Sequence, residues 1–445
     1  MKVVEKQESN TLLKSDAPFH SWYRFVLSYP PHLVRKYVEE FDLGSGDLLY
    51  DPFCGTGTTL VEGKKLGIRT VGSEAHPFTA MVSRVKSNWS LKTDQLEGIA
   101  REIGRKAEQA CNKHGLPPLS FVTSLLREKP SGMLNGYSLD ADEAGMIPTG
   151  FMSDRPLGRL LILRHWIEKL TEQEPPALRE FFYVALAHVI SNGAGNFSFG
   201  PEIYKTKAKN DYDVLGHFSQ QVAIMISDLV VSKDWPGRKI STRVYEDDAR
   251  ELSKIPRGIT SVITSPPYPN EKDYTRTTRV ESVLLRFMTH RKQLREVKHS
   301  LLRSNTRNVF VADDDLNEVA GFESIRRVCE QIEARRVELN KTSGFERLYH
   351  KVVAHYFGGM KKHFRKLKSK LEPGAKLAYV VGDQYSFLMV PVRTATLLAE
   401  VAESEGYRVK GIELWRERVG TRVRNGLEAQ KTVRVREEIL ILEMP

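Results

Sequence analysis

The sequence has little cysteine and no long hydrophobic run. Its three cysteines, Cys54, Cys111 and Cys329, are scattered along 445 residues, which excludes a disulfide framework and a zinc site made of clustered cysteines. No run of about 18 apolar residues occurs, so we expect no membrane span. The first residues lack the apolar segment of a signal peptide, and no set of metal ligands stands out. We therefore expect a protein of the reducing cytoplasm that holds no metal.

Acidic side chains are fewer than basic ones. The chain carries 56 aspartates and glutamates against 67 lysines and arginines, and its formal net charge is +11. Such an excess favours a polyanionic partner, although it says nothing about the fold. With 445 residues and 40% hydrophobic content, the chain exceeds one typical domain. We expect two packed units or one domain with a large insertion.

A glycine-containing motif follows an early apolar segment. The stretch "LLYDPFCGTGTTLVEG", residues 48–63, predicts a strand ending at Asp51, a loop with Gly55 and Gly57, and a helix. The next strand, in "IRTVGSEAHP", ends at Glu74. Such a unit binds its ligand at the carboxyl ends of parallel strands. The two glycines allow close backbone approach, and Glu74 can accept hydrogen bonds from two ribose hydroxyls.

The residues around the two glycines argue against two common classes of nucleotide site. A phosphate-binding P-loop would need a Gly-Lys-Ser/Thr sequence, but Thr58, Thr59 and Leu60 follow the second glycine here. Leu60 also occupies the third glycine position of a dinucleotide fingerprint. An acid directly before the loop suits an amine rather than a pyrophosphate. The pattern therefore favours a sulfonium cofactor with an amino acid tail and an adenosine head, which is S-adenosylmethionine.

A second motif ends another apolar strand. Residues 259–264 are followed by Ser265, Pro266, Pro267 and Tyr268. The two prolines fix φ and remove two backbone donors, so the local polar groups are mostly acceptors, namely the Ser265 hydroxyl and the Pro266 carbonyl. Acceptors aimed at one point can hold an exocyclic amino group. Tyr268 offers a flat face for a base to stack on, which is worth roughly 1–3 kcal/mol in single-strand binders.

With both motifs the sequence resembles the amino-methyltransferases that act on DNA and make N4-methylcytosine or N6-methyladenine from S-adenosylmethionine. "DPFCGTGTT" resembles the cofactor loop of that family, "TSPPY" its catalytic motif and "VGSEAHP" its ribose-binding motif. "VYEDDAREL" resembles the strand end whose acid holds the adenine amino group, and the segment containing "SYPPH" resembles the part that closes over the methionine end. The resemblance implies that the cofactor is bound by Tyr29, Asp51, Phe53, Gly55, Gly57, Thr58, Thr59, Glu74, Ala75, His76, Asp247 and Asp248.

The resemblance also implies the chemistry. Hydrogen bonds accepted from the amino group at Ser265 and Pro266 would favour a pyramidal nitrogen, and most of the rate gain would come from positioning and preorganised dipoles. The target base must leave the duplex to reach Tyr268. The Pro-Cys nucleophile of the C5-cytosine enzymes does not occur. Cys54 is therefore expected to be a small buried residue.

Several alternatives stay open. In this family a serine at the head of the motif is associated more with cytosine N4, and an aspartate or asparagine with adenine N6, so we expect cytosine and keep adenine as the alternative. An RNA amino-methyltransferase shares both motifs. A nucleic-acid-binding module that kept the fold without catalysis is the remaining possibility. Intact Asp51, Gly55, Gly57, Glu74 and Ser-Pro-Pro-Tyr argue against it.

The order of strands predicts an α/β fold, a Rossmann-like seven-stranded methyltransferase sheet with a large, mainly helical insertion. We expect strands near residues 48–53, 69–74, 242–246, 259–265, 376–382, 407–415 and 436–444. The catalytic domain is then split into residues 1–89 and 240–445, and residues 90–239 form the insertion. The prolines of "SYPPH" are expected at a helix start, and "GAGNFSFGPEIY" is expected to be a loop.

Double-stranded DNA is the expected partner, together with a possible cognate restriction endonuclease in a prokaryotic cytoplasm, where the enzyme would associate with the nucleoid through DNA. The insertion is the first candidate for target recognition, and residues 270–345 are the second. Tyr274 and Arg276 follow the catalytic tyrosine and are expected in the base pocket. Arg422 and Arg424 lie in a basic segment between the last two strands and are expected to contact phosphate.

Overall fold

The computed structural model describes residues 12–25, 27–117, 136–200, 202–419 and 433–445. Within them, seven strands form one sheet in the order β5–β2–β1–β6–β7–β9–β8. These strands are β1 (Leu48–Asp51), β2 (Arg69–Ser73), β5 (Thr242–Tyr245), β6 (Ile259–Thr264), β7 (Leu371–Gly382), β8 (Arg408–Val419) and β9 (Arg434–Glu443). The first five in this order run parallel, and β9 is antiparallel to both β7 and β8. The predicted Rossmann-like methyltransferase sheet and its closing hairpin are confirmed.

The strand register brings the two motifs together. In the pairing of β1 with β2, Asp51 lies opposite Gly72, and in the pairing of β1 with β6, Tyr50 lies opposite Val262. The carboxyl ends of these three strands therefore meet at one edge of the sheet. Ligands of open α/β sheets bind at this edge.

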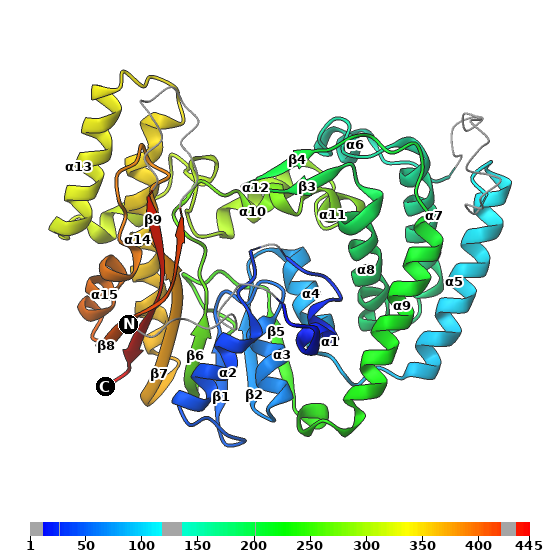
Figure 1. The fold of residues 1–445 in the computed structure, drawn as a ribbon, viewed down its shortest axis with the longest axis horizontal. Helices are drawn as coiled ribbons and strands as arrows, with labels where there is room; N and C mark the ends of the chain where they lie inside the picture. Colours follow the sequence, from blue (N-terminus) through cyan, green and yellow to red (C-terminus); the bar gives the residue numbers. More distant parts are fainter. Residues whose placement is uncertain (1–11, 26, 118–135, 201, 420–432) are drawn as a thin grey trace.

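Helices cover both faces of the sheet (Figure 1). They include α2 (Pro31–Glu40), α3 (Thr58–Lys65), α4 (Pro77–Ser87), α14 (Tyr349–Lys368) and α15 (Thr394–Ser404). Leu33, Val34 and Tyr37 of α2 are buried in one cluster with strand residues such as Ile263. Helix α2 begins at Pro31, directly after Pro30, which confirms that the prolines of "SYPPH" start a helix.

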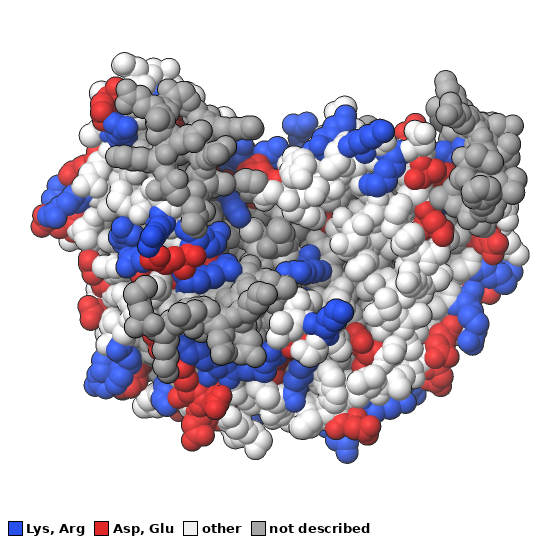
Figure 2. Space-filling view, viewed as in Figure 1, with Lys and Arg blue, Asp and Glu red and all other residues white. Residues whose placement is uncertain are grey.

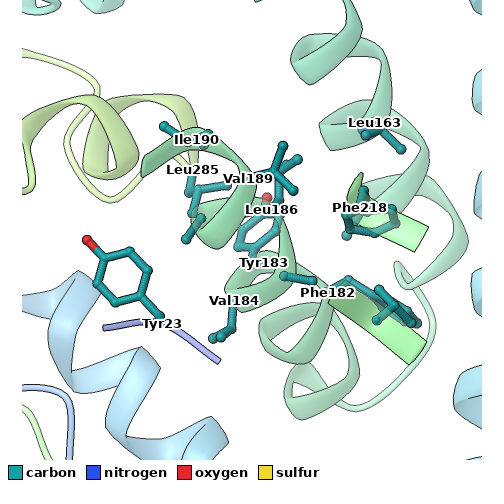
Figure 3. Packing of buried hydrophobic residues seen from close by; sticks show 14 of the residues in the cluster. Tyr23, Leu163, Phe182, Tyr183, Val184, Leu186, Val189, Ile190, Phe218 and Leu285 are labelled. Atoms are coloured by element: carbon teal, nitrogen blue, oxygen red, sulfur yellow. The ribbon is translucent and has the colours of Figure 1, made fainter. Parts of the chain in front are cut away.

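The insertion between β2 and β5 folds into a helical body on the right of Figure 1. It contains α5 (Thr93–Lys113), α6 (Ala141–Met146), α7 (Asp154–Leu170), α8 (Pro176–Val189), a π-helical turn (Ile190–Ala194) and α9 (Val214–Val231). Figure 3 shows Phe182, Val184 and Leu186 of α8 among neighbouring apolar side chains, and all three are buried. Trp22 from the N-terminal segment packs against Phe181 with 5.8 Å between ring centroids. The insertion and the N-terminal segment therefore share one core.

The sequence "GAGNFSFGPEIY" is not only a loop, as expected, because it contains two short strands. β3 (Phe197–Phe199) pairs antiparallel with β4 (Ile203–Lys205), and Ser198 lies opposite Tyr204. Three residues per strand are too few for a visible alternation of polar and apolar positions. The prediction was therefore wrong at this point.

Helix α9 is the most apolar long helix of the described part. By length and composition alone, Val214–Asp234 could cross a membrane, although the sequence has no uninterrupted apolar run of that kind. One side of α9 packs in the helical core through Phe218, Val222 and Met225. A core helix passes the same test, so the composition of α9 is weak evidence for a membrane span.

A long connection links β6 to β7 and lies across the carboxyl edge of the sheet. It includes α10 (Tyr274–Thr277), α11 (Arg279–Leu284), α12 (Arg291–Ser300) and α13 (Glu323–Glu338), and it ends in α14. Short 3-10 turns lie at Thr306–Asn308, Asp315–Val319 and Glu346–Leu348. Figure 1 shows α10 and α12 beside β3 and β4, above the sheet in this view. The connection and the insertion thus meet over the edge where the motifs converge.

Candidate active site

One cavity of about 310 Å³ collects both sequence motifs. Of the residues expected to act, it is lined by Tyr29, Phe53, Gly55, Thr58, Glu74, Ala75, His76, Asp247, Ser265, Pro266, Pro267, Tyr268 and Tyr274. Its size is within the range of small-molecule sites. The structure therefore brings residues that follow four strand ends, those of β1, β2, β5 and β6, and residues of the segment before β1 to a common space.

Gly55 and Gly57 both have positive φ angles, but the space around the two residues differs. Gly57 has φ of +88°, and a Cβ there would lie 2.7 Å from the Oγ of Ser83 and 3.2 Å from its Cα. Gly55 has φ of +51°, and a Cβ there would meet nothing closer than 4.0 Å. Gly57 thus permits the close packing of α3 on α4. Gly55 leaves its backbone uncovered on the cavity wall.

The Glu74 carboxylate is held between two backbone donors at the cavity wall. It accepts hydrogen bonds from the Gly55 N–H at 2.9 Å and the His76 N–H at 2.8 Å. Burial raises the pKa of Glu74 to about 7, against the opposing effect of these two hydrogen bonds. Each oxygen keeps a lone pair for a further donor. The arrangement can accept two hydroxyl groups of a ribose.

His76 carries a nitrogen without a partner in the described part of the chain. Its Nε2 lies 3.0 Å from the Thr278 hydroxyl, whereas its buried Nδ1 has no hydrogen-bond partner there. Burial lowers the pKa of His76 to about 4, so the imidazole is neutral at pH 7. A neutral ring nitrogen in a lined cavity is suited to a hydrogen bond with a bound ligand.

Asp51 lies beneath the cavity wall rather than on it. Its side chain is fully buried and accepts hydrogen bonds from Thr264 at 2.6 Å, Thr59 at 2.7 Å and Tyr29 at 3.3 Å. Burial raises the pKa of Asp51 to about 6. The carboxylate therefore positions Tyr29, which lines the cavity. A direct contact of Asp51 or of Thr59 with the cofactor stays a prediction.

The two acids after β5 have different surroundings. Asp247 lines the cavity, and its carboxylate accepts hydrogen bonds from the backbone N–H groups of Asp248 at 3.1 Å and Lys254 at 2.9 Å. Asp248 does not line the cavity, and its carboxylate pairs with Arg250 at 2.6 Å. Of the two predicted acids, Asp247 is therefore the one that faces the cavity.

The catalytic motif presents oxygen acceptors to the cavity. The Ser265 hydroxyl donates its proton to the Val380 carbonyl oxygen at 3.0 Å and also interacts with the Tyr268 hydroxyl. Its oxygen, with two lone pairs, can still accept from a further donor. Tyr268 packs beside Gly382, where a Cβ would lie 3.2 Å from Cε2 of the ring. Burial raises the pKa of Tyr268 well above its usual range, so the phenol is neutral.

Part of the cavity wall comes from residues that the sequence did not indicate. They include Lys272 after the catalytic motif and, from the β8–β9 hairpin, Trp415, Arg416, Arg418 and Glu437. Glu437 pairs with Arg416 and, at 2.7 Å, with Arg418. The buried Nε1 of Trp415 has no partner in the described ranges. Burial lowers the pKa of Lys272, and the charge of Arg418 lowers it further.

The residues of the β8–β9 hairpin could not be found from sequence motifs, because it is the antiparallel pairing of β8 and β9 that places Arg416 opposite Glu437. Of the predicted nucleic-acid contacts, Tyr274 lines the cavity, while Arg276 does not and instead pairs with Glu202 at 2.5 Å. Arg422 and Arg424 lie outside the described residues.

Comparison with known proteins gives one long similarity and several short ones, and no family model matches the chain. The chain is 25% identical to the Type II methyltransferase M.BsoBI of Geobacillus stearothermophilus over an alignment of 452 residues, which covers 96% of this chain and 86% of that protein. The Type II methyltransferase M.MjaII of Methanocaldococcus jannaschii is 33% identical over 67 residues, 15% of this chain and 12% of that protein. The tRNA (guanine(10)-N2)-dimethyltransferase of Methanothermobacter thermautotrophicus is 34% identical over 74 residues, 17% of this chain and 21% of that protein.

Proposed function

We propose that this chain, a member of the S-adenosylmethionine-dependent DNA methyltransferase family, methylates the exocyclic amino group of a base extruded from double-stranded DNA, and that this base is cytosine, modified at N4. The observation that carries the proposal is the single cavity lined by Gly55 and Glu74 on one side and by Ser265, Pro266 and Tyr268 on the other. Cofactor loop and base-binding motif are far apart in the sequence, and a shared cavity is what a transfer between their ligands requires.

The chain's own residues fit the cofactor. Glu74 is suited to the ribose hydroxyls, and the uncovered Gly55 backbone admits the ligand closely. Asp247 is suited to the adenine amino group, and the first turn of α3, which begins at Thr58, favours the carboxylate of an amino acid tail. When bound, S-adenosylmethionine supplies a sulfonium methyl group for transfer to a nitrogen lone pair.

The amino group of the base is held by acceptors. Because the Ser265 proton is directed to Val380, the serine oxygen and the Pro266 carbonyl both accept N–H hydrogen bonds from the base. These contacts turn the nitrogen lone pair out of conjugation and toward the cofactor side of the cavity. The Tyr268 ring supports the face of the base. Positioning and fixed dipoles then supply most of the rate gain, without an enzyme nucleophile.

Two features favour cytosine over adenine. The motif begins with Ser265, whose hydroxyl is a weaker acceptor than a carboxylate. The cavity wall also carries donors, namely Lys272, Arg416 and the unpartnered Nε1 of Trp415. Cytosine presents a carbonyl oxygen and a ring nitrogen as acceptors beside its amino group, whereas adenine has no carbonyl oxygen. Adenine N6 is the alternative that the experiment below must exclude.

DNA is favoured over RNA by the extent of the similarities. The similarity to a Type II methyltransferase spans nearly the whole chain, whereas the similarity to a tRNA methyltransferase spans 17% of it. A Type II relationship also makes a cognate restriction endonuclease the expected partner. We infer a place in the prokaryotic cytoplasm, with the enzyme bound to nucleoid DNA.

The test is the transfer of tritiated methyl groups from S-adenosylmethionine to plasmid DNA and, in parallel, to tRNA. Nuclease digestion to nucleosides and mass spectrometry then identify the product. The proposal expects N4-methyldeoxycytidine in the DNA and no label in tRNA, with Ser265→Ala as the inactive control. Detection of N6-methyldeoxyadenosine would instead identify adenine as the target base. Label in tRNA alone would show that the protein is an RNA methyltransferase. Cofactor binding without any methyl transfer would favour a non-catalytic nucleic-acid-binding module.

A further inference from the structure

The β3–β4 hairpin of the insertion reaches the rim of the active cavity. Gly200, in the turn between the two strands, is one of the residues that line this cavity. The ring of Tyr204 packs on Gly200, because a Cβ at that glycine would lie 3.2 Å from Cε1 of the tyrosine. Yet Tyr204 is 52% exposed. A large aromatic side chain therefore packs on a residue of the cavity rim, with much of its own surface open to solvent.

The base of this hairpin is firmly held by the helical body. Asn196, which is 1% exposed, donates its backbone N–H to the Phe151 carbonyl at 2.7 Å and accepts the Thr206 N–H at 2.8 Å. Its side-chain amide donates to the Ser153 hydroxyl at 2.9 Å. The rings of Phe197 and Phe151 are stacked at 5.7 Å. The exposed position of Tyr204 is thus a property of an ordered element.

The tip of the hairpin is tied to the connection between β6 and β7. Glu202 pairs with Arg276 at 2.5 Å and with Arg307 at 3.5 Å, and both arginines belong to the connection between β6 and β7. Lys205 and Lys207 beside Tyr204 are exposed. Figure 2 shows lysine and arginine side chains over β3, β4 and the helices beside them. Positive charge around the hairpin is complementary to the DNA backbone.

We propose that the β3–β4 hairpin contacts the duplex at the target site and that Tyr204 occupies the space which the extruded base leaves. The proposal rests on the proposed function, since only an enzyme that extrudes a base creates such a gap. Extrusion costs a few kcal/mol because neighbouring bases lose their stacking partner. An aromatic ring held on a rigid arm offers the bases beside the gap one stacking face in place of the lost one. Lys205 and Lys207 then contact phosphates.

Tyr204 is distinguished from the other exposed aromatic side chain of the described ranges. Phe345 is 53% exposed, but the Arg307 guanidinium lies over its ring at 5.5 Å. Tyr204 is not itself one of the residues that line the cavity, but its ring packs on Gly200, which is. It is therefore the aromatic group placed to meet an incoming base step.

The test compares Tyr204→Ala, Tyr204→Phe and Val337→Ala on a duplex containing the sequence that the wild-type protein methylates. Val337, which is 59% exposed on α13, is the matched surface control. Tyr204→Ala should lower kcat/KM by about tenfold or more, the range expected for loss of one stacking partner. Tyr204→Phe and Val337→Ala should stay near wild type, and the Kd for S-adenosylmethionine should be unchanged in all three.

A second duplex separates this role from a structural one. Removing the base opposite the target lowers the cost of extrusion, so that extrusion limits the reaction less. The defect of Tyr204→Ala should therefore shrink on a duplex with an abasic site there. An equal defect on both duplexes, or a Tyr204→Ala enzyme as active as Val337→Ala, would overturn the proposal while the wild-type activity stands. A wild-type protein that transfers no methyl group to any DNA would instead overturn the proposed function, and this inference with it.

Discussion

The Thr264 hydroxyl donates a 2.6 Å hydrogen bond to the Asp51 carboxylate, and this contact joins the last residues of β6 and β1. The two residues are 213 positions apart in the chain. Asp51 directly precedes the glycine loop, and Thr264 directly precedes Ser265. The relative position of the two motifs therefore depends on a fully buried carboxylate and its hydroxyl donors.

Replacing Thr264 by valine should destabilise the fold and reduce transfer together. The substitution preserves the shape of the side chain but leaves a buried carboxylate without one of its donors, which costs about 1–3 kcal/mol. The free energy of unfolding from denaturant titration measures the first effect. Thr264→Ser keeps the hydroxyl and should recover most of the loss. A Thr264→Val protein as stable as Thr264→Ser would show that the contact does not support the site.

Substitution of Ser265 or Tyr268 by alanine should reduce methyl transfer while leaving the affinity for the cofactor nearly unchanged. Ser265→Ala loses an acceptor aimed at the amino group, and we expect kcat to fall by about 100-fold or more. Tyr268→Ala loses the stacking face, whereas Tyr268→Phe keeps it and should retain most activity. Calorimetric titration with S-adenosylmethionine should give nearly unchanged Kd values for all three. Loss of cofactor binding in both alanine variants would mean that the motif has a different role.

Glu281 should make the protein less stable as the pH rises. It is fully buried, accepts a 3.0 Å hydrogen bond from Tyr23, and its Oε2 has no partner in the described residues. Burial raises its pKa to about 7 from an unfolded value of about 4.5. Between these values the native state binds more protons than the unfolded state. The free energy of unfolding therefore falls as the pH rises through this window.

The matched substitution is Glu281→Gln, which keeps the Tyr23 acceptor and removes the charge. At pH 8 it should raise the free energy of unfolding by an amount on the order of 1–3 kcal/mol and flatten its pH dependence between about pH 4.5 and 7. Glu403→Gln, at an exposed position of α15, serves as the control and should change neither. Equal pH profiles for wild type and Glu281→Gln would contradict the assignment.

Cofactor affinity should weaken as the pH falls. The pKa of Glu74 is raised to about 7 by burial, so the carboxylate that would accept the ribose hydroxyls becomes protonated below that value. A protonated acid is a poorer acceptor. The Kd for S-adenosylmethionine, measured by calorimetry from pH 8.5 to about pH 5.5, should therefore rise through pH 7. Glu74→Gln should bind more weakly and remove this dependence. A flat wild-type profile would exclude Glu74 as the ribose acceptor.

The sheet and the two motifs could be predicted because their signals are local. Apolar runs ending in Asp51, Glu74 and Ser265 mark strand ends, and each predicted strand of the sheet is present. The glycine pattern and the double proline carry their own backbone constraints. These features depend on neighbouring residues in the chain, so one sequence suffices to recognise them.

The rest of the site depends on long-range packing. Glu437 meets Arg416 only through the register of β8 and β9, and a charged pair inside a basic hairpin has no distinctive sequence pattern. Tyr204 lies in β4, which has three residues and is too short to show an alternation of polar and apolar positions. Of the two acids after β5, Asp247 faces the cavity while Asp248 pairs with Arg250. The sequence offered no means of separating them.

The central claim is that cofactor and target amine meet in one cavity between Glu74 and Ser265. A crystal structure of the protein with sinefungin, the S-adenosylmethionine analogue that carries an amine in place of the transferable methyl, tests this most directly. The account predicts ribose hydroxyls on Glu74 and the amine of the ligand directed toward Ser265 and Pro266. A ligand bound at another surface, or bound here with its amine directed away from the Ser-Pro-Pro-Tyr motif, would contradict it.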